Sequence, residues 1–461
     1  MSASLSAMTE AAQLTERRGA GTLPRLLLGI PEGRAMTYAE HLDVHGPLPG
    51  EHGRGRRRAR DRAEGLVAEI ERAGLLGRGG AAFPTATKMR AVASSRGRAI
   101  VLANGAEGEP ASLKDHTLIE LLPHLVIDGA VLAAEAVNAD EAIIAVCELA
   151  VDGLDSVAVA LEERAGAPGR SGSSPRLTLA VVPSHYVAGQ ESALVNYVNG
   201  GPAKPLFTPP MAFEKGVRRR PTLVNNVETL AHMALIGRHG AGWFRQLGTP
   251  SQPGSALVTL SGPIAHPGVY EVEHGASLRS LIEAGGGAAA GLRGALLGGY
   301  SGAWVDAEHL HGVALSDEHL APHEATLGAG VVLLLSEHAC PVAETARLSR
   351  WLAGQSARQC GPCVHGLDAL ADVFARLAEG SATGKPAERI DRLASLVARR
   401  GACGHPDGTL RVLFSALETF GAEFADHARH GPCEACGNPA ELPLPARPVS
   451  DATAGRRGQR L

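Results

Sequence analysis

Five of the seven cysteines lie in the last quarter of the chain with the spacing of metal or cluster ligands. Cys360 and Cys363 form one CxxC pair, Cys403 follows about forty residues later, and Cys433 and Cys436 form a second pair. Thiolates at such spacing bind iron–sulfur clusters or zinc. We expect a cytoplasmic location without an export signal, where CxxC pairs indicate ligands and not disulfides.

The cysteine spacing leaves three interpretations open. Cys360, Cys363 and Cys403 are typical ligands of an iron–sulfur cluster held by helix ends and loops. Alternatively, the two CxxC pairs together supply four thiolates to zinc, or the thiols bind nothing. We favour the cluster. Cys147, in an apolar segment, and Cys340, before a proline, are expected to be structural.

A glycine-rich stretch between Gly74 and Thr85 has the composition of a loop that binds an anion. Glycines allow backbone N–H groups to approach a phosphate closely, and the helix that follows adds its positive end. Lys88 lies one or two turns further along and can meet a phosphate. The candidate binding residues of the loop itself are Gly77, Arg78, Gly79, Gly80 and Phe83.

Three further polar stretches are expected beside this loop. Ligand crevices in open α/β sheets lie at the carboxyl ends of strands, and two of the stretches directly follow apolar strand-like segments. Their amides and carboxylates can bind the hydroxyl groups of a ribose or a ribityl chain. A pair of adjacent asparagines must be satisfied by a polar ligand or a turn, because unpaired buried amides are costly. The residues are Asn104, Glu107 and Glu109, then Gly189 and Glu191, and then Asn225 and Asn226.

Strands that alternate with helices must position these stretches. The pattern predicts a helix over Asp61–Ala73, strands at Ala99–Ala103, Ala142–Val146 and Leu177–Val182, and one long helix capped by Ser112. This order indicates an α/β layer structure with a largely parallel sheet. The basic run Arg54–Arg62 is interpreted as a solvated loop.

The later part of the chain changes texture twice. Residues 256–335 alternate hairpin-like strands with one short helix that ends on glycines, which indicates a small α+β module. From about Pro341 four amphipathic segments predict a helical bundle. The tail after about Gly437 is rich in Pro, Ala and Arg and is expected to be disordered.

Composition sets broad limits on the class of protein. At roughly 100–200 residues per domain, 461 residues suffice for two to four domains. A net charge of −4 argues against a nucleic-acid or anionic-membrane binder. The longest apolar segment, Leu125–Val137, is short and contains charges, so we expect no membrane span.

Six segments together resemble one known family. GLLGRGGAAFPT, NGAEGEPASLKDH, YVAGQESALVNYVNG, RPTLVNNVETLA, QCGPC and GACGHPDG occur in the order and at the distances of the NADH-oxidising flavoprotein subunit of respiratory complex I and its soluble-dehydrogenase relatives. The resemblance covers about residues 65–430. It implies a multidomain α/β protein with an FMN-binding α/β domain, a ubiquitin-like β-grasp (SLBB) module and a C-terminal helical bundle with a [4Fe–4S] cluster.

The resemblance also implies boundaries and roles. We expect an extension at 1–64, the FMN and dinucleotide domain at 65–248, the β-grasp module at 249–336, the iron–sulfur helices at 337–430 and a tail at 431–461. The resemblance implies that the residues of the four stretches bind cofactor, and it adds Gly108, Tyr186 and Thr229 to them. Phe83, Glu109 and Glu191 would lie on the nicotinamide dinucleotide side. Hydride would pass from nicotinamide to flavin, and electrons would then leave singly through the cluster without an acid–base catalyst.

The sequence departs from the family pattern at several positions. Ala91 replaces a stacking phenylalanine, and Thr208 and Met211 replace a lysine and a phenylalanine on the adenine side. Ala106 and Gln190 replace acidic residues. Ala357 replaces the first cysteine of the family's CxxCxxC. The cluster is therefore either [3Fe–4S], or [4Fe–4S] with a fourth ligand drawn from His365, His405, Cys433 or Cys436.

These departures leave three functions to weigh. The leading one is an electron-transfer flavoprotein that takes electrons from NAD(P)H or another donor and passes them to a ferredoxin-like or quinone-linked partner subunit. The second is a degenerate binding or assembly subunit without turnover. The third is a zinc-containing nucleotide-binding protein.

Overall fold

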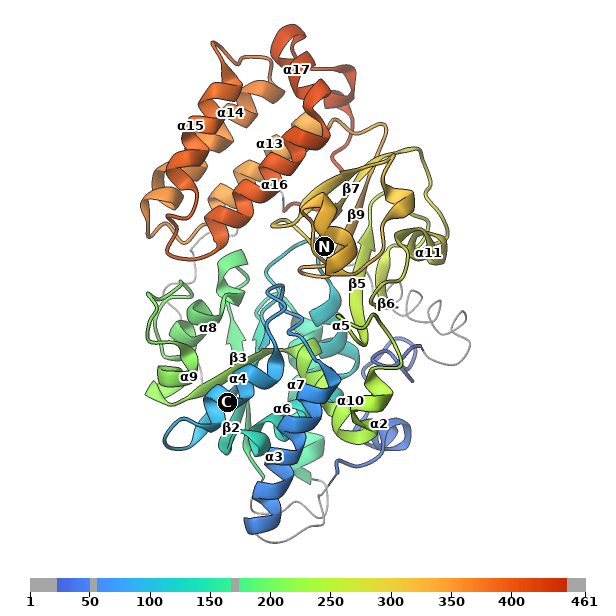
Figure 1. The fold of residues 1–461 in the computed structure, drawn as a ribbon, viewed down its shortest axis with the longest axis vertical. Helices are drawn as coiled ribbons and strands as arrows, with labels where there is room; N and C mark the ends of the chain where they lie inside the picture. The colour runs from blue at the N-terminus through green and yellow to red at the C-terminus, as the bar shows by residue number, and fades with distance from the viewer. Residues whose placement is uncertain (1–22, 50–55, 167–173, 446–461) are drawn as a thin grey trace.

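The computed structural model describes residues 23–49, 56–166 and 174–445, with side chains omitted for 56–62. A parallel-sheet region and a helical region lie at opposite ends of the molecule, and a mixed sheet lies beside them (Figure 1). In the described ranges no single helix has the length and hydropathy to cross a membrane. Among these residues only the adjoining helices α5 (Lys114–Leu121) and α6 (Pro123–Ala136), bent by 96° at their junction, meet those criteria as a pair.

The first region is built on a four-stranded, all-parallel sheet. Its spatial order is β3-β2-β1-β4, so the chain first winds outward from β1 and then returns to pair β4 on the other side of β1. Its elements are α2 (Tyr38–His45), α3 (Arg56–Ala73), α4 (Thr85–Ala93), β1 (Ala99–Gly105), α5 (Lys114–Leu121), α6 (Pro123–Ala136), β2 (Ala139–Cys147), α7 (Val151–Gly166), β3 (Arg176–Val182), η1 (Tyr186–Gly189), α8 (Glu191–Val198), α9 (Ala212–Lys215), η2 (Val217–Arg219), β4 (Thr222–Asn226) and α10 (Val227–Phe244).

Helices cover both faces of this sheet. Val101 and Ala103 of β1 pack into the core shared with α3, α6 and α10, whereas Ile100 and Leu102 pack into a smaller core with α8. A strand buried on both faces is apolar at every position, and this explains why the segment AIVLA shows no alternation of polar and apolar residues.

Helices α6 and α10 cross with backbone contact at one glycine. A Cβ atom added to Gly129 would lie 1.9 Å from the carbonyl oxygen of Leu230. Gly129→Ala is therefore expected to lower the free energy of unfolding by about 3 kcal/mol, although alanine favours helix. The matched control is Gly65→Ala in the middle of α3, where nothing lies within 4 Å. This control should be neutral or stabilising in denaturant melts; equal losses for both variants would contradict the close crossing.

The second region is a mixed five-stranded sheet of order β6-β5-β9-β7-β8. Strands β5 and β9 pair in parallel and the other pairs are antiparallel. Its elements are β5 (Ser255–Ser261), β6 (Gly268–Glu273), α11 (Leu278–Ala284), β7 (Leu292–Leu297), β8 (Ala303–Asp306), η3 (Leu310–Gly312), α12 (Asp317–Leu320), η4 (Ala321–His323) and β9 (Val331–Ser336). The expected hairpin-like strands and short helix are present, and β8 is additional.

The third region is helical. Its elements are α13 (Pro341–Gly354), the π-helical turn η5 (Pro362–Gly366), α14 (Leu367–Ala378), α15 (Pro386–Val397), α16 (His405–Thr419), α17 (Gly421–His430) and the short turn η6 (Glu434–Gly437). The last predicted segment is split at Phe420 into α16 and α17. Helix α17 lies at the end of the bundle remote from the parallel sheet (Figure 1).

Several local predictions are wrong. The long helix after Ser112 is two helices, α5 and α6, and the Ser112 hydroxyl donates to Glu107 and to the carbonyl of Ala329 instead of capping. The basic run belongs to α3 from Arg56 onward, while 50–55 lie outside the described residues. Disorder does not hold for 438–445, where Leu442 is only 2% exposed; the remaining tail lies outside the described residues.

Candidate functional site

The candidate crevice lies where the order of the parallel sheet reverses. Strands β1 and β4 are neighbours, with Ala103 opposite Asn225 and Asn104 opposite Asn226. The chain leaves β1 toward β2 on one side and reaches β4 on the other side only after β3, so the strand order reverses between β1 and β4. Open α/β sheets bind ligands at such a point, beside the carboxyl ends of the strands. The second and fourth predicted stretches therefore meet there, as the sequence predicts. The strand β4 itself was missed, because only five residues carry it.

The glycine-rich loop is held beside this crevice by its own backbone. The N–H of Gly77 donates to the carbonyl of Phe83, 2.9 Å away, and closes the loop. The N–H of Arg78 donates to Thr229 Oγ1 at 2.9 Å, which ties the loop to the first turn of α10. A Cβ atom on Gly79 would touch Asn226 at 3.4 Å, so the small residue permits this approach.

The two asparagines after β4 have different surroundings. Asn226 caps α10, accepting from Glu228 N at 3.0 Å, and its amide donates to Asp115 Oδ2 at 2.6 Å. Asn225 is 7% exposed, and its Nδ2 has no hydrogen-bond partner among the described residues. The turn at the start of α10 therefore satisfies Asn226, whereas the Asn225 amide is left for a ligand. Each alternative in the prediction applies to one of the two asparagines.

Lys88 joins three of the four stretches. Its ammonium donates to Glu191 Oε2 at 2.6 Å and to the carbonyl of Val224 at 3.0 Å. Both side chains of this pair are about 30% exposed, so the charges stay accessible from the crevice. Phe83 stands at the rim with half of its surface exposed.

The second and third stretches interlock through glycines. A Cβ atom on Gly108 would lie 2.6 Å from the carbonyl oxygen of His185, and one on Gly189 would lie 2.5 Å from that of Ala106. Asn104 fastens the same contact, because its Nδ2 donates to the carbonyl of Gly189 at 2.8 Å. These residues shape the crevice wall through backbone contact.

The Glu107 carboxylate already has a partner within the protein, His116. Its carboxylate lies 2.9 Å from His116 Nδ1 and accepts from the His116 N–H at 3.0 Å. Burial alone would raise the pKa of Glu107, but His116 outweighs it and lowers that pKa to about 2. Burial would lower the pKa of His116, but Cys147 and Glu107 raise it to about 10. At neutral pH the two form a buried ion pair, so Glu107 shapes its loop through His116.

Glu109 and Tyr186 reach out of the parallel-sheet region. Glu109 accepts from the N–H of Tyr300 at 2.6 Å, and the hydroxyl of Tyr186 lies 2.8 Å from Ser301 Oγ. Both partners belong to the turn between β7 and β8. Burial raises the pKa of Glu109 to about 8; the hydrogen bond from Tyr300 offsets part of that rise, and Glu107 adds a smaller increase.

Removing the charge of the buried Glu109 carboxyl is expected to stabilise the folded protein, by an amount that depends on pH. Between its usual pKa near 4.5 and about 8 the folded chain keeps a proton that the unfolded chain has released, so stability falls as pH rises. Gln retains the acceptor for Tyr300 without the charge. Glu109→Gln should therefore match the wild type at pH 4.5 and exceed it by a few kcal/mol at pH 8.5, at about 1.4 kcal/mol per pKa unit. Thermal melts at both pH values check this; a pH-independent difference would contradict it.

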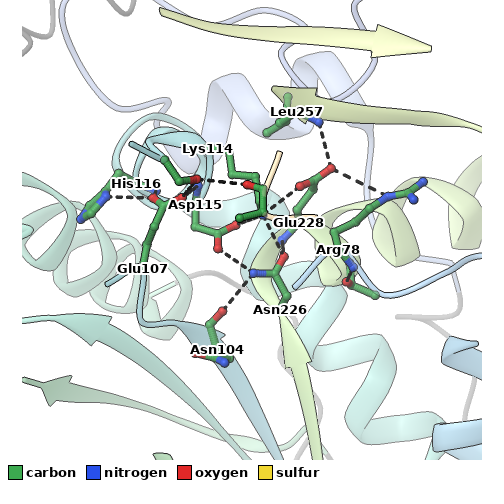
Figure 2. Close-up of polar contacts among 12 residues, drawn as sticks. Arg78, Asn104, Glu107, Lys114, Asp115, His116, Asn226, Glu228 and Leu257 are labelled. Atoms are coloured by element: carbon green, nitrogen blue, oxygen red, sulfur yellow. Dashed lines mark hydrogen bonds and ion pairs between the residues drawn. The ribbon is translucent and has the colours of Figure 1, made fainter. Parts of the chain in front are cut away.

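A buried charge network beneath the loop was not predicted as part of the site. Lys114 Nζ lies 2.7 Å from Asp115 Oδ1 and 3.0 Å from Glu228 Oε2, and Arg78 Nε lies 3.9 Å from Glu228 Oε1 (Figure 2). Burial would raise the pKa of Glu228, but Lys114 leads the charges that lower it to about 2. Glu228 also accepts from the N–H of Leu257 in β5. The network thus fixes the loop, α5, α10 and the mixed sheet to one another.

One feature of the sequence does indicate such a network of buried charges. Lys114, Asp115 and His116 are three consecutive ionisable residues at the start of a helix whose remaining positions are mostly buried. Buried charges must be paired, so such a run predicts partners from other segments. Glu228 lies in the quoted fourth stretch as well, but no spacing rule connects it to Lys114.

Three cysteine thiols gather at the end of the helical region that faces the parallel sheet. Cys360 and Cys363 lie in the turn between α13 and α14, and Cys403 precedes α16. Burial raises the pKa of Cys363 to about 12, and the thiols of Cys360 and Cys403 contribute further, as expected for neighbouring sulfurs. Ala357 is 3% exposed in the same connection and offers no ligand atom.

The second CxxC pair belongs elsewhere. Cys433 and Cys436 lie beside Cys340 and His427. Cys340 caps the start of α13, whereas Cys360 follows its end, and this helix of fourteen residues is about 21 Å long. A four-thiolate site made of both CxxC pairs is therefore wrong, and neither Cys433 nor Cys436 supplies the fourth cluster ligand. His405 is buried, and its Nε2 contacts the carbonyl of Leu352 at 2.9 Å.

The comparisons with known proteins agree with this arrangement. The chain matches the Nuo51 FMN-binding domain over residues 70–235, the SLBB domain over 257–299 and the NADH-ubiquinone oxidoreductase-F iron–sulfur binding region over 343–427. It is 32% identical over 371 residues to the NADH-quinone oxidoreductase F subunit of Streptomyces coelicolor, covering 78% of this chain and 82% of that relative. The chain belongs to the family of NADH-quinone oxidoreductase F subunits.

The chain is also similar to proteins of hydrogenases. The chain is 29% identical to NADP-reducing hydrogenase subunit HndC of Solidesulfovibrio fructosivorans, covering 80% of this chain and 77% of that one. A crystal structure of NAD⁺-reducing [NiFe]-hydrogenase in the H2-reduced state superposes with a TM-score of 0.75 at 30% identity, covering 84% of this chain and 67% of that one. The resemblance inferred from the six segments is confirmed.

The crevice fits the flavin that F subunits bind. The Asn225 amide is a buried polar group without a hydrogen-bond partner in the described part of the chain. It can donate to an oxygen atom of a polar ligand. Lys88 adds an accessible positive charge, and these groups suit a phosphorylated, hydroxyl-rich molecule such as FMN.

Proposed function

We propose that this F-subunit relative takes electrons from a reduced nicotinamide dinucleotide, or from another donor, and passes them through FMN and an iron–sulfur cluster to a partner protein. FMN, when bound, accepts a hydride and releases electrons one at a time. The proposed flavin contacts are the four stretches identified in the sequence. The proposed cluster ligands are Cys360, Cys363 and Cys403.

One loop supports this proposal most directly, because it joins the crevice to the thiols. The N–H of Tyr186 donates to Gln355 Oε1 at 3.0 Å, and the Tyr186 ring packs edge-on against Trp351 and His405 with centroids 5.4 and 5.5 Å away. His405 lies two residues after Cys403. The loop that borders the crevice therefore also contacts the segments that carry the thiols.

The chain's own residues have separate tasks in this scheme. Arg78, held by Thr229 and by the carbonyl of Ser255 at 3.0 Å, positions the glycine-rich loop. The Asn225 amide and Lys88 bind and orient the ligand. The Lys114–Glu228 pair keeps the floor of the crevice rigid without offering a proton to the reacting atoms.

The partner is expected to approach the cluster end of the helices. The named relatives are subunits of larger redox assemblies. We propose a ferredoxin-like or quinone-linked subunit as the acceptor. Electron transfer to it requires only proximity to the cluster, so the contacts that select it lie outside the crevice.

The function can be tested on protein purified without oxygen. Flavin content, iron content and the visible spectrum are measured before and after stepwise addition of NADH. About one FMN and three or four iron atoms per chain, with flavin and cluster bands that bleach on addition, are expected. Protein that lacks both flavin and iron would sink the proposal.

A second candidate function, that of a binding or assembly subunit without turnover, follows from the residues that depart from the family pattern. Gln190 does not replace the expected acidic group functionally, because its side chain caps α8 by accepting from Ala193 N at 2.9 Å. Flavin and iron at full occupancy without reduction by NADH, but with reduction by dithionite, would favour a different donor. Absence of any turnover with such cofactors would favour an assembly subunit.

A further inference from the structure

Four potential metal ligands meet at the end of the helical region remote from the crevice. The ligand atoms of Cys340, His427, Cys433 and Cys436 all lie within 4.8 Å of one another. Cys340 directly precedes α13, His427 lies on α17, Cys433 directly precedes the turn η6, and Cys436 lies within that turn. Cys340 and His427 are buried, Cys436 is half-buried and Cys433 is exposed. This group is independent of the proposed electron-transfer function.

The distances match the edges of a zinc tetrahedron. Zn–S bonds of about 2.3 Å and a Zn–N bond of about 2.0 Å give S···S edges of about 3.8 Å and S···N edges of about 3.6 Å. The sulfur of Cys436 lies 3.8 Å from that of Cys433 and 3.4 Å from that of Cys340. Nε2 of His427 lies 3.6 Å from the sulfur of Cys340 and 3.9 Å from that of Cys436.

The same distances disfavour the other chemistry open to cysteines. A disulfide needs an S–S distance of about 2.05 Å, and all of these thiols are free. The ligands of a multi-iron cluster are attached to different irons and spread further apart than the ligands of one ion. A set as compact as this one fits a single tetrahedral metal.

The imidazole is oriented for coordination through Nε2. His427 Nδ1 lies 3.4 Å from the carbonyl of Leu377 and can donate only as Nδ1–H, which leaves the lone pair on Nε2. A backbone carbonyl on the ring nitrogen that faces away from the ion is typical of metal-binding histidines. The N–H of Cys433 donates to Nε2 at 3.4 Å, a long hydrogen bond that places the CxxC turn beside this lone pair and that a bound metal ion would replace.

We propose that Cys340, His427, Cys433 and Cys436 bind one structural Zn²⁺. Three thiolates and one imidazole complete a tetrahedron and leave no open position, which is typical of structural and not of catalytic zinc. Metal binding releases the thiol protons to solvent and involves no electron transfer. The sequence predicts a structural role for Cys340 and leaves several alternatives for the ligand that Cys433 and Cys436 bind.

The zinc ion would fasten the segment after α17 to the start of α13. Beyond η6 the chain runs back along the junction of β9 and α13. There the N–H of Ser336 donates to Glu441 Oε2 at 2.9 Å, and the N–H of Glu441 donates to Glu344 Oε1 at 2.7 Å. Asn438 Nδ2 donates to the carbonyl of His338 at 2.8 Å. Few apolar side chains hold this segment, so the metal supplies a crosslink that its small core does not.

The first test uses the full chain purified without added metal or chelator. Metal analysis is expected to give about one zinc per chain in addition to iron. X-ray absorption at the zinc edge should show three sulfur neighbours and one nitrogen neighbour. Zinc at background level, a shell of oxygen atoms, or two thiols lost to a disulfide would each overturn the proposal.

Matched cysteine variants separate this site from the iron–sulfur ligands. Cys433→Ser, at an exposed position, should reduce zinc to background, leave iron and flavin unchanged, lower the Tm by several degrees and speed proteolysis after Gly431. Cys363→Ser should remove iron and leave zinc unchanged. Loss of iron in Cys433→Ser with no zinc in the wild type would reassign the group to iron and overturn the proposal.

Two variants at His427 test the site independently, in case Cys433→Ser folds poorly. His427→Cys offers four thiolates to the same ion and should keep the zinc, whereas His427→Ala should lose it. If both bind zinc equally, His427 is no ligand and the proposed site is wrong.

Discussion

Cys363→Ser is expected to leave the flavin in place and to stop electron transfer to an external acceptor. Cys363 is 1% exposed and sits between the thiols of Cys360 and Cys403, so a serine there removes a thiolate that no neighbour replaces. Loss even of outer partners of a metal site typically costs 10- to 100-fold. Removal of a direct ligand should therefore lower acceptor reduction by roughly 10²-fold or more.

The measurement compares two steps in the same preparation. Bleaching of the flavin by the electron donor reports the first step, and reduction of a ferredoxin-like acceptor reports the second. Only the second should fall, together with the iron content. Cys433→Ser is the matched control, since it removes a thiol at the other end of α13 and should keep the second step. Acceptor reduction at the wild-type rate by iron-free Cys363→Ser would show that electrons leave by another route.

The local pattern of the parallel sheet could be predicted because its strands are buried on both faces. Continuous apolar runs such as Ala99–Ala103 and Ala142–Val146 have few alternatives to a central strand, and the structure extends them by only a few residues. The break between α5 and α6 was not predictable from periodicity. Both helices continue the same apolar stripe, and only Pro123 at the first position of α6 marks the bend.

A similar distinction holds for the candidate site: residues that shape it through backbone contact could be predicted, and the partners of its buried charges could not. Gly189 was singled out because glycine allows a close approach, and Gly108 was carried over from the family resemblance; both lie where the backbones of two loops meet. The actual partners of buried charges were not found. Glu107 pairs with His116, and Glu109 with the amide of Tyr300, 191 positions away. Such pairs depend on how domains pack, and residue spacing carries no information about it.

The grouping of the cysteines was the clearest failure of spacing. Two CxxC pairs in one chain suggest a common site, yet α13 places them at opposite ends of the helical region. Cys340 and His427 complete the second group from positions that have no ligand spacing at all. Sequence order does not reveal which helix ends meet, and the packing of α13 against α17 decides it.

Binding of NADH is expected to be weaker than in F subunits that keep the full dinucleotide site, and restoring three side chains should recover it. Ala91 lies on α4, one turn after Lys88, and α4 packs against α9. Just beyond α4, the Ser95 hydroxyl lies 3.1 Å from the carbonyl of Phe213 in α9. Thr208 and Met211 lie just before α9 and are both exposed, so a dinucleotide can reach them.

The size of the effect follows from the missing contacts. Each aromatic ring stacked on a base or nicotinamide contributes about 1 kcal/mol. A lysine on a phosphate contributes about 1.5–3 kcal/mol. Their combined loss, about 3.5–5 kcal/mol, predicts a Kd for NADH that is higher by roughly 10²- to 10³-fold or more, at about 1.4 kcal/mol per factor of ten. Thr208→Lys alone should lower the Kd about tenfold or more, and the triple variant Ala91→Phe, Thr208→Lys, Met211→Phe should recover most of the difference.

Equilibrium titration of the flavin absorbance or fluorescence measures this Kd under anaerobic conditions, with NAD⁺ as a non-reducing ligand for comparison. Thr208→Gln is the matched control, because it adds length without charge and should gain little. Raising the salt concentration should weaken the lysine variant more than the glutamine variant, since the added contact is ionic. A wild-type Kd in the low micromolar range would mean that other side chains have taken over the lost contacts. The exposed ring of Phe207, next to Thr208, is then the first residue to replace by alanine.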